Sequence, residues 1–335
     1  MLRIGIVGAG DISFVHADVY TRLPNTQIVA WADPVEGNAQ KRAELFGGRV
    51  FSTIQELLDR EHVDIVDICS PDSLHTIHAE EALRAGKHVL CEKPLGLDIQ
   101  EAEAIVRLAQ ESPNIFMVGQ VLRFFPEYEW IRAFVKEGTL GEPIAAYAAR
   151  LNPYPVWREW FRNPKISGGV ATDLMIHDVD YCHWVFGRAE RVSAIGKKDQ
   201  YGIWNHVQSL LSFSSGVTAT VEASYLMPSG FPTTFIFRLL CENGCIEYAK
   251  RAEKTVTVFE PEKEPSYPEI VREDPFLKEI KYFVGCVERG EKPEFIRPEE
   301  ALYSLRIVLA VLDSLEKNGE PVAIETGLKG SILDA

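Results

Sequence analysis

The sequence predicts an α/β fold: a doubly wound parallel sheet, followed by an α+β domain with a large, mostly antiparallel open sheet. Over roughly the first 120 residues, short β-branched runs alternate with helical patterns, which is typical of βαβ crossovers. Beyond this point most segments alternate apolar and polar residues with a period of two. Since 335 residues exceed the size of one usual core, we expect two domains, 1–120 and 121–335.

The first domain is predicted from five short apolar runs separated by helices with their own start signals. Thr53 and Glu56 have the spacing of a capping box ahead of an apolar pair, and Asp98 and Glu101 repeat that spacing. In such a sheet, ligands bind at the carboxyl ends of the strands. The expected strands are residues 2–7, 27–32, 63–69, 87–91 and 115–118.

The second domain is predicted from strand-like segments whose alternation indicates a sheet with one covered face. Helical patterns interrupt these segments at 125–137, 170–186 and 275–289, and a long amphipathic helix is expected over 298–318. The expected strands are 144–151, 191–195, 207–213, 217–223, 234–241 and 245–248.

Composition narrows the classes of partner. The formal net charge of −14 and the absence of a basic run disfavour nucleic acid. No apolar run approaches the roughly 20 residues of a membrane span, and a strand that begins at Leu2 leaves no room for a signal peptide. The six cysteines are scattered, and no second pair joins Cys241 and Cys245 to complete a zinc site. We therefore expect a cytoplasmic protein without a metal.

A glycine turn directly follows the first expected strand. Gly8 permits a tight turn, and Gly10 lets the backbone approach a pyrophosphate at the helix N-terminus that Asp11 and Ile12 begin. Ser13 stands where a third glycine is usual, but it is small enough for close packing of helix and strand. The pattern indicates a dinucleotide site.

Asp33 ends the second expected strand, 23 residues after Gly10 (33 − 10). Its carboxylate would accept hydrogen bonds from the adenosine ribose hydroxyls and repel a 2′-phosphate. Pro34 and Val35 offer no cation for such a phosphate, so NAD is favoured over NADP. The alternative is an ordinary turn or helix-capping aspartate.

Glu92-Lys93-Pro94 follows the apolar run 88–91, which places a lysine at the carboxyl end of a strand. A lysine there can take part in proton chemistry if its surroundings favour the neutral amine. Without other context, a lysine between Glu and Pro is more often a solvated loop residue. The Lys93–Pro94 bond is also a candidate for the cis form.

Asp173 and His177 follow the pair Gly168-Gly169 and are four residues apart, so on a helix they share one face. Histidine can take a hydroxyl proton near neutral pH, and a carboxylate can orient it. One alternative makes Asp173, His177 and Asp180 metal ligands. The other is a capping aspartate beside an unrelated histidine.

Together these motifs resemble the glucose-fructose oxidoreductase, inositol dehydrogenase and MocA-like (Gfo/Idh/MocA) oxidoreductase family, from one end of the chain to the other. The matching segments are Gly8-Ala9-Gly10, Ser70-Pro71-Asp72-Ser73-Leu74-His75, residues 85–95 with Glu92-Lys93-Pro94, and Gly168-Gly169 with Asp173, His177 and Asp180.

The resemblance implies a Rossmann domain and an α+β domain whose open sheet forms a homodimer or homotetramer. It implies NAD-dependent oxidation of a secondary alcohol on a sugar, inositol or related polyol. Lys93 would bind the reacting hydroxyl, His177 would be the base, and Asp173 would position the substrate or His177. The cofactor-binding residues would be Gly8, Gly10, Asp11, Ile12, Asp33, Ser70, Pro71, His75, Glu92, Lys93 and Gln120. The substrate-binding residues would be Lys93, Arg123, Trp160, Asp173 and His177.

The substrate itself is not predicted. Trp157, Arg158 and Trp160 precede the Gly168-Gly169 motif and could stack on a sugar face or pair with an anion, but they could equally be core or interface residues. The sequence gives no functional signal for the remaining histidines, among them His16 and His62. Two other functions stay open: an NAD-dependent glycoside hydrolase on the same scaffold, and a non-catalytic dinucleotide-binding sensor.

Overall fold

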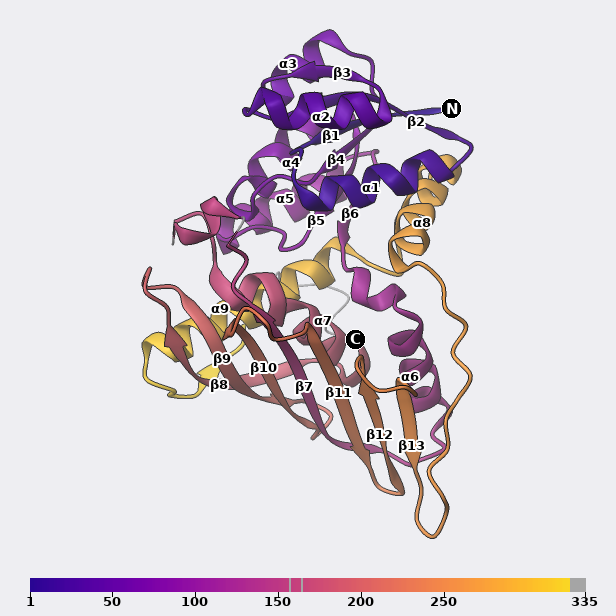
Figure 1. Ribbon diagram of the computed structural model, residues 1–335, viewed down its shortest axis with the longest axis vertical. Helices are drawn as coiled ribbons and strands as arrows, with labels where there is room; N and C mark the ends of the chain where they lie inside the picture. The colour runs from indigo at the N-terminus through magenta and orange to yellow at the C-terminus, as the bar shows by residue number, and fades with distance from the viewer. Residues whose placement is uncertain (157, 164, 326–335) are drawn as a thin grey trace. The chain divides into compact units, whose positions relative to one another are not determined.

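The computed structural model describes residues 1–156, 158–163 and 165–325, which form two compact units (Figure 1). The first unit comprises Met1–Val121 and Asp274–Leu302. The second begins with Leu122–Glu273 and continues from Tyr303. The sequence analysis placed all of 121–335 in one domain, whereas Asp274–Leu302 packs with the first unit.

The first unit contains a six-stranded parallel sheet in the order β3-β2-β1-β4-β5-β6. The order reverses between β1 and β4, which is where doubly wound sheets bind dinucleotides. All five expected strands are present, and β3 is an addition too short to show a periodic pattern. The strands are β1 Leu2–Val7, β2 Thr26–Ala32, β3 Arg49–Phe51, β4 Ile65–Ile68, β5 His88–Glu92 and β6 Phe116–Gly119.

Two helices of this unit begin at the capping residues that the sequence indicated. Thr53 accepts a hydrogen bond from the Glu56 backbone, and Asp98 accepts from the backbones of Gln100 and Glu101. Asp274 caps α8, which packs against α1 within the unit. The helices are α1 Asp11–Arg22, α2 Glu36–Phe46, α3 Ile54–Arg60, α4 His75–Arg84, α5 Ile99–Glu111 and α8 Pro275–Arg289.

The second unit contains an eight-stranded sheet in the order β13-β12-β11-β7-β10-β9-β8-β14. Every pairing is antiparallel except that of β10 with β7, so the predicted mostly antiparallel sheet is confirmed. The strands are β7 Pro143–Pro153, β8 Ala189–Lys198, β9 Trp204–Phe213, β10 Thr218–Met227, β11 Thr234–Cys241, β12 Gly244–Ala249, β13 Val256–Phe259 and β14 Val322–Ala323.

One face of this sheet is covered. On β9, Val207 and Leu211 are buried in a core that includes Ile176 and Val179 of α7, whereas Leu210 between them is exposed. This alternation is the reason that the period-two pattern was visible in the sequence. The helices that begin or continue here are α6 Pro126–Glu137, α7 Ile176–Phe186 and α9 Pro298–Glu316. Among the described residues, no helix has the length and apolar character that crossing a membrane requires.

Candidate active site

The glycine turn after β1 has the geometry that a dinucleotide site needs. Gly8 has a φ of +93°, and a Cβ there would lie 2.5 Å from the Cys69 carbonyl oxygen, so only glycine fits. A Cβ on Gly10 would meet no heavy atom of the described residues within 4 Å. Gly10 is also the N-cap of α1 and provides no side-chain cap. A pyrophosphate fits these features.

Asp33 lies beside this turn, at the end of β2. Its Oδ2 accepts a hydrogen bond from the Ala9 backbone at 2.8 Å, and its Oδ1 accepts one from Val35 at 2.8 Å. A carboxylate has about four acceptor sites, so it can still accept ribose hydroxyls. Arg42 of α2 is a cation that the sequence analysis did not consider, and its guanidinium donates to the Gly10 carbonyl at 2.8 Å.

His75 joins two turns at the carboxyl edge of the sheet. Its Nδ1 lies 2.7 Å from the Pro94 carbonyl oxygen, and its Nε2 lies 2.8 Å from the Ser70 carbonyl oxygen. The Lys93–Pro94 peptide is cis. Both ring nitrogens thus contact protein carbonyls, and His75 holds the Ser70-Pro71 turn against the turn that carries Lys93.

Gln120 follows β6 and is almost fully buried. Neither polar atom of its amide has a hydrogen-bond partner among the described residues. Buried amides are nearly always paired in folded proteins. A polar ligand at the carboxyl edge of the sheet would supply the missing partner, which is a second feature that fits a bound cofactor.

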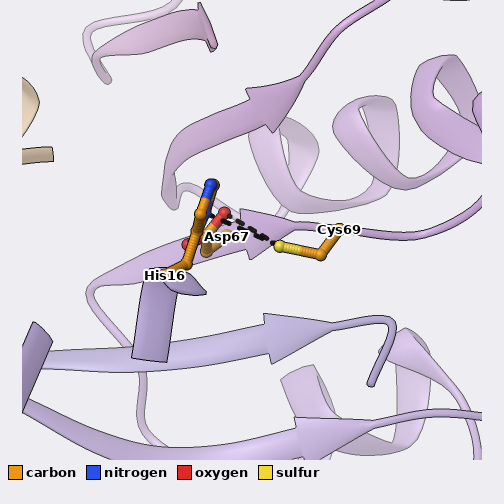
Figure 2. Close-up of side chains that lie close together, drawn as sticks. All are labelled: His16, Asp67 and Cys69. Carbon is orange, nitrogen blue, oxygen red and sulfur yellow. Dashed lines mark hydrogen bonds and ion pairs between the residues drawn. The ribbon is translucent and has the colours of Figure 1, made fainter. Parts of the chain in front are cut away.

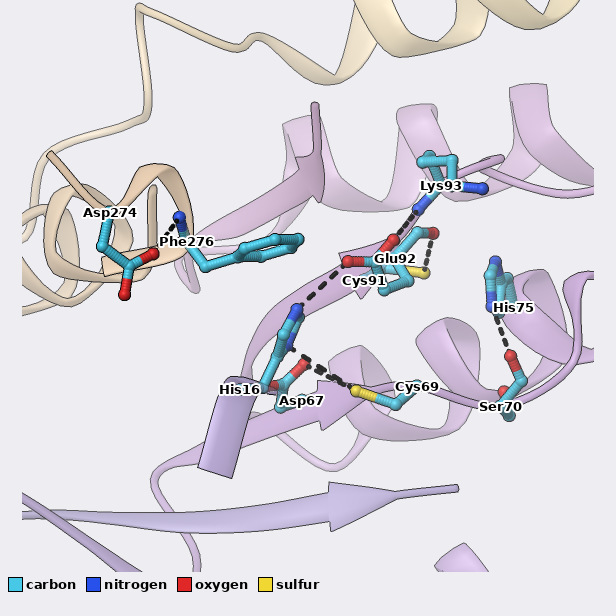
Figure 3. Close-up of polar contacts among 10 residues, drawn as sticks. All are labelled: His16, Asp67, Cys69, Ser70, His75, Cys91, Glu92, Lys93, Asp274 and Phe276. Carbon is cyan, nitrogen blue, oxygen red and sulfur yellow. Dashed lines mark hydrogen bonds and ion pairs between the residues drawn. The ribbon is translucent and has the colours of Figure 1, made fainter. Parts of the chain in front are cut away.

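Glu92 ends β5 with its carboxylate buried between two donors (Figure 3). Its Oε1 lies 3.1 Å from His16 Nε2, and its Oε2 accepts the Lys93 backbone N–H at 3.1 Å. Burial opposes ionisation, but the hydrogen bond and charge of His16, together with the charge of Lys93, lower the pKa of Glu92 below its ordinary value. The residue beside Lys93 is therefore a carboxylate.

His16 is the residue that the sequence analysis missed. It lies on the buried face of α1, with Nδ1 2.9 Å from Asp67 Oδ2 and 3.7 Å from Cys69 Sγ (Figure 2). Burial disfavours its charged form, yet the ion pair with Asp67 raises the pKa of His16 well above its ordinary value. A signal was present in the sequence: Asp67 interrupts the apolar run 65–68, and a carboxylate buried in a central strand needs a cationic partner.

His16, Asp67 and Cys69 offer ligand atoms within 4.8 Å of one another, close enough to hold a metal ion. Hydrogen bonds account for the same arrangement, because Cys69 Sγ donates to Asp67 Oδ1 at 3.6 Å. Burial and the neighbouring Asp67 raise the pKa of Cys69 to about 12, which keeps it a thiol. The cluster is a hydrogen-bonded charge network.

In the second unit, Asp173 lies in a π-helical turn, Ala171–Met175, which continues into α7 with His177. Such turns are frequent at functional sites. Asp173 is buried, and its Oδ2 accepts hydrogen bonds from Arg158 Nη1 at 3.1 Å and from the Tyr225 hydroxyl. His177 is half-buried. The expected α-helical spacing is thus altered by the π turn, and Arg158 and Tyr225 hold the aspartate.

Two other predicted residues form a structural ion pair. Arg123 is fully buried and donates from Nε and Nη2 to the two carboxylate oxygens of Asp180, both at 2.8 Å. The Ser304 hydroxyl donates to the same carboxylate. Both oxygens of the Asp180 carboxylate are thus engaged within the second unit, and the substrate contact of Arg123 stays a prediction. Trp160 is half-buried against Phe161, and Trp157 lies outside the described residues.

A parallel sheet with this strand order, an open glycine turn and an aspartate after β2 defines a dinucleotide-binding protein of the Rossmann class. Two family models match the chain. Residues 2–120 match an oxidoreductase family with an NAD-binding Rossmann fold, and residues 128–247 match the GFO/IDH/MocA C-terminal domain. The chain belongs to the Gfo/Idh/MocA family and is a nicotinamide-dependent oxidoreductase.

The curated relatives include several dehydrogenases. The chain is 27% identical over 97% of its length to the scyllo-inositol 2-dehydrogenase (NAD(+)) of Bacillus subtilis (strain 168), of which it covers 96%. It is 30% identical to the inositol 2-dehydrogenase of Rhizobium meliloti (strain 1021), with 69% of the chain and 71% of that protein covered. A UDP-N-acetylglucosamine 3-dehydrogenase of Acidithiobacillus ferrooxidans is 31% identical, with 67% of each covered.

Solved structures share the whole fold. A myo-inositol 2-dehydrogenase from Lactobacillus plantarum superposes with a TM-score of 0.84 at 23% identity, covering 97% of this chain and 99% of that one. A levoglucosan dehydrogenase in complex with NADH and L-sorbose gives a TM-score of 0.88 at 19% identity, covering 97% and 99%.

Proposed function

We propose that this protein transfers a hydride reversibly between a secondary alcohol of a sugar, inositol or related polyol and NAD. One observation carries the proposal: the open glycine turn, Asp33, Lys93 and the unpaired amide of Gln120 all follow the carboxyl ends of strands in one parallel sheet, namely β1, β2, β5 and β6. The names of the curated relatives support the substrate class.

The chemistry requires a base and a cation. A bound nicotinamide would supply the acceptor for the hydride of the carbinol carbon. The substrate hydroxyl must lose its proton, and a cation beside the developing alkoxide lowers the barrier. In the proposal Lys93 holds the hydroxyl oxygen, His177 takes the proton, and Asp173 hydrogen-bonds the substrate. The proposal requires Lys93 of the first unit and His177 of the second to act on one substrate.

The proposed cofactor preference is NAD over NADP. Asp33 is fixed by the Ala9 and Val35 backbones, so its negative charge would remain close to any 2′-phosphate. Arg42 is the cation that could attract such a phosphate, but its guanidinium already donates a hydrogen bond to the Gly10 carbonyl. We propose that repulsion by Asp33 outweighs attraction by Arg42.

The second unit is proposed to bind the substrate and to form the oligomer, a homodimer or homotetramer, in the cytoplasm. The face of its sheet that no core covers displays exposed apolar side chains on three strands: Ile195 of β8, Leu210 of β9 and Leu240 of β11. Cross-strand pairing places these residues on the same face. An apolar sheet face of this kind is typical of an interface between copies.

The test is a screen of polyols, inositols, aldoses, uronic acids and nucleotide sugars for reduction of NAD, with NADP in parallel. On the substrate found, Lys93→Ala and His177→Ala should each lower kcat/KM by about 10²–10⁴-fold. Lys136→Ala and His62→Ala are matched controls because both side chains are exposed, and they should retain full activity. Full turnover by both active-site variants would refute the assignment. Release of an aglycone without net NADH would indicate the glycoside hydrolase instead.

A further inference from the structure

A continuous chain of three ionisable side chains runs through the interior of the first unit, from β4 through α1 to β5 (Figures 2 and 3). His16 lies at its centre, with Asp67 at 2.9 Å from Nδ1 and Glu92 at 3.1 Å from Nε2. The side chains of His16 and Asp67 are 0% exposed, and that of Glu92 is 9% exposed. Only the Glu92 end of the chain therefore reaches the carboxyl edge of the sheet.

The hydrogen-bond geometry of these three side chains indicates the protonation state of His16. A neutral imidazole carries a single N–H, but here each ring nitrogen faces a carboxylate oxygen, which can only accept when ionised. Buried carboxylates without a partner are too costly to persist. In the arrangement that pairs both ionised carboxylates, both ring nitrogens donate and His16 is an imidazolium. The raised pKa of His16 and the lowered pKa of Glu92 agree with this count.

This hydrogen-bonded chain of side chains ends at the backbone N–H of Lys93. Glu92 Oε1 contacts His16, while its Oε2 accepts the Lys93 N–H at 3.1 Å. Gly119 pairs with Glu92 across β5 and β6, and a Cβ there would lie 3.3 Å from Oε1. The carboxylate is thus confined between His16, the Lys93 backbone and β6, where any side chain at residue 119 would press against it.

We propose that His16 is a positioning residue of the active site, which fixes the Glu92 carboxylate and through it the backbone from which Lys93 extends. The inference rests on the proposed function, because the placement of Lys93 matters only if it binds the reacting hydroxyl. His16 itself touches neither substrate nor cofactor in this proposal. Its effect is on the geometry of the hydride-transfer step, in which a displacement of about 1 Å can cost about 100-fold in rate.

The residues packed around His16, Asp67 and Glu92 keep these three side chains in one charge state. The Phe276 ring of α8 lies 6.1 Å from the His16 ring and helps to exclude water. Burial raises the pKa values of the nearby thiols and phenol, so they bring no charge near neutral pH. The titratable groups around His16 and Glu92, from α1, β4, β5, the turns and α8, are Tyr20, Cys69, Cys91, His75, Lys93 and Glu279.

Two amide variants separate the two contacts of His16. A glutamine nitrogen reaches the position of Nε2 and can still donate to Glu92, whereas an asparagine nitrogen reaches that of Nδ1 and can donate only to Asp67. His16→Asn should lower kcat by about 10- to 100-fold, with little change in KM for NAD, and His16→Gln should recover most of the loss. If asparagine and glutamine are equally damaging, the contact with Glu92 is not the one that matters.

A double-mutant cycle tests whether His16 acts through Glu92. In His16→Asn/Glu92→Gln the loss of kcat should be no greater than in Glu92→Gln alone, because the second change removes the same connection. Cys69→Ala is the matched stability control, because Cys69 contacts His16 and Asp67 but not Glu92. Cys69→Ala should lower the free energy of unfolding and leave kcat unchanged. Additive losses, or an equal loss of kcat in Cys69→Ala, would overturn the proposal.

Nitrogen NMR of the histidine rings tests the wild-type protein and does not depend on the folding of any variant. His16 should carry protons on both ring nitrogens at neutral pH, before and after NADH is added. A single protonated nitrogen, or one equivalent of bound zinc in the purified protein, would overturn the inference. A wild type inactive on every polyol refutes only the proposed function. An active wild type in which His16→Asn behaves like Cys69→Ala refutes only this inference.

Discussion

Gly8 and Gly10 belong to one turn, yet alanine should have opposite effects at the two positions. Gly8 has a φ of +93°, and its Cβ would lie 2.5–2.6 Å from backbone atoms of Cys69 and Ser70. Gly10 has a φ of −77° and a ψ of −163°, which is extended backbone, with open space where its Cβ would be. Gly8→Ala should therefore impair folding, and Gly10→Ala should impair only cofactor binding.

The expected changes in unfolding free energy and in cofactor affinity follow from the surroundings of the two glycines. Left-handed backbone costs a non-glycine residue about 1–2 kcal/mol, and the overlap with a neighbouring backbone adds about 1–3 kcal/mol, so Gly8→Ala should lose about 2–5 kcal/mol. Gly10→Ala should change stability by less than about 1 kcal/mol, toward the stabilising side. Its methyl group would displace a phosphate from the backbone N–H groups. Losing one charged hydrogen bond of about 1.5–3 kcal/mol weakens binding by about 10- to 150-fold.

Urea unfolding and titration with NADH separate the two effects. Gly10→Ala should unfold like the wild type and bind NADH about 10- to 150-fold more weakly. Gly8→Ala should unfold at a lower urea concentration whether or not NADH is present. If Gly10→Ala bound NADH as tightly as the wild type, the glycine turn would not be the pyrophosphate site.

Three further outcomes are expected. Asp33→Asn should lower kcat/KM with NAD about tenfold and raise the preference for NADP; an unchanged ratio between the two cofactors would contradict the role of Asp33. Arg123→Met leaves the buried Asp180 carboxylate without its cationic partner and should cost about 3–5 kcal/mol in urea unfolding, whereas a loss below about 1 kcal/mol would show that the pair contributes little. His16 has a raised pKa, so its contribution to stability is complete below its ordinary value of 6.5 and is lost as the pH rises through the raised value. The stability difference between wild type and His16→Asn should shrink by up to about 1.4 kcal/mol per pH unit as the pH rises from 6.5 toward the raised value, and a constant difference would mean that His16 is neutral.

Most of the fold was predictable because its signals are local. Runs such as 2–7 and 87–91 are long and apolar enough to show as strands, and Thr53 and Asp98 mark helix starts directly. The short edge strands β3 and β14 have three and two residues and cannot show a period. The sequence also predicted the helix at 275–289, but an amphipathic stripe does not say which unit it covers.

The residues of the candidate site also divide into those with a local signal in the sequence and those without one. Gly8 and Asp33 could be predicted because a positive φ and a strand end are properties of their own segments. The pairing of Arg123 with Asp180 joins positions 57 residues apart, and either side chain alone resembles a surface charge. The π turn that holds Asp173 has no pattern that distinguishes it from an α-helix in one sequence.

His16 shows how such a long-range contact could be inferred. Asp67 lies in the middle of a buried parallel strand next to β1, where a carboxylate needs a cation. The helix after the glycine turn packs on this sheet, and His16 is the titratable side chain on its buried face that can supply the charge. The same helix therefore has two tasks in our proposals: its N-terminus receives the pyrophosphate, and His16, further along α1, fixes Glu92 beside Lys93. A substitution that shifts α1 along the sheet should then weaken NADH binding and lower kcat together, whereas Gly10→Ala should affect binding and His16→Asn should affect turnover.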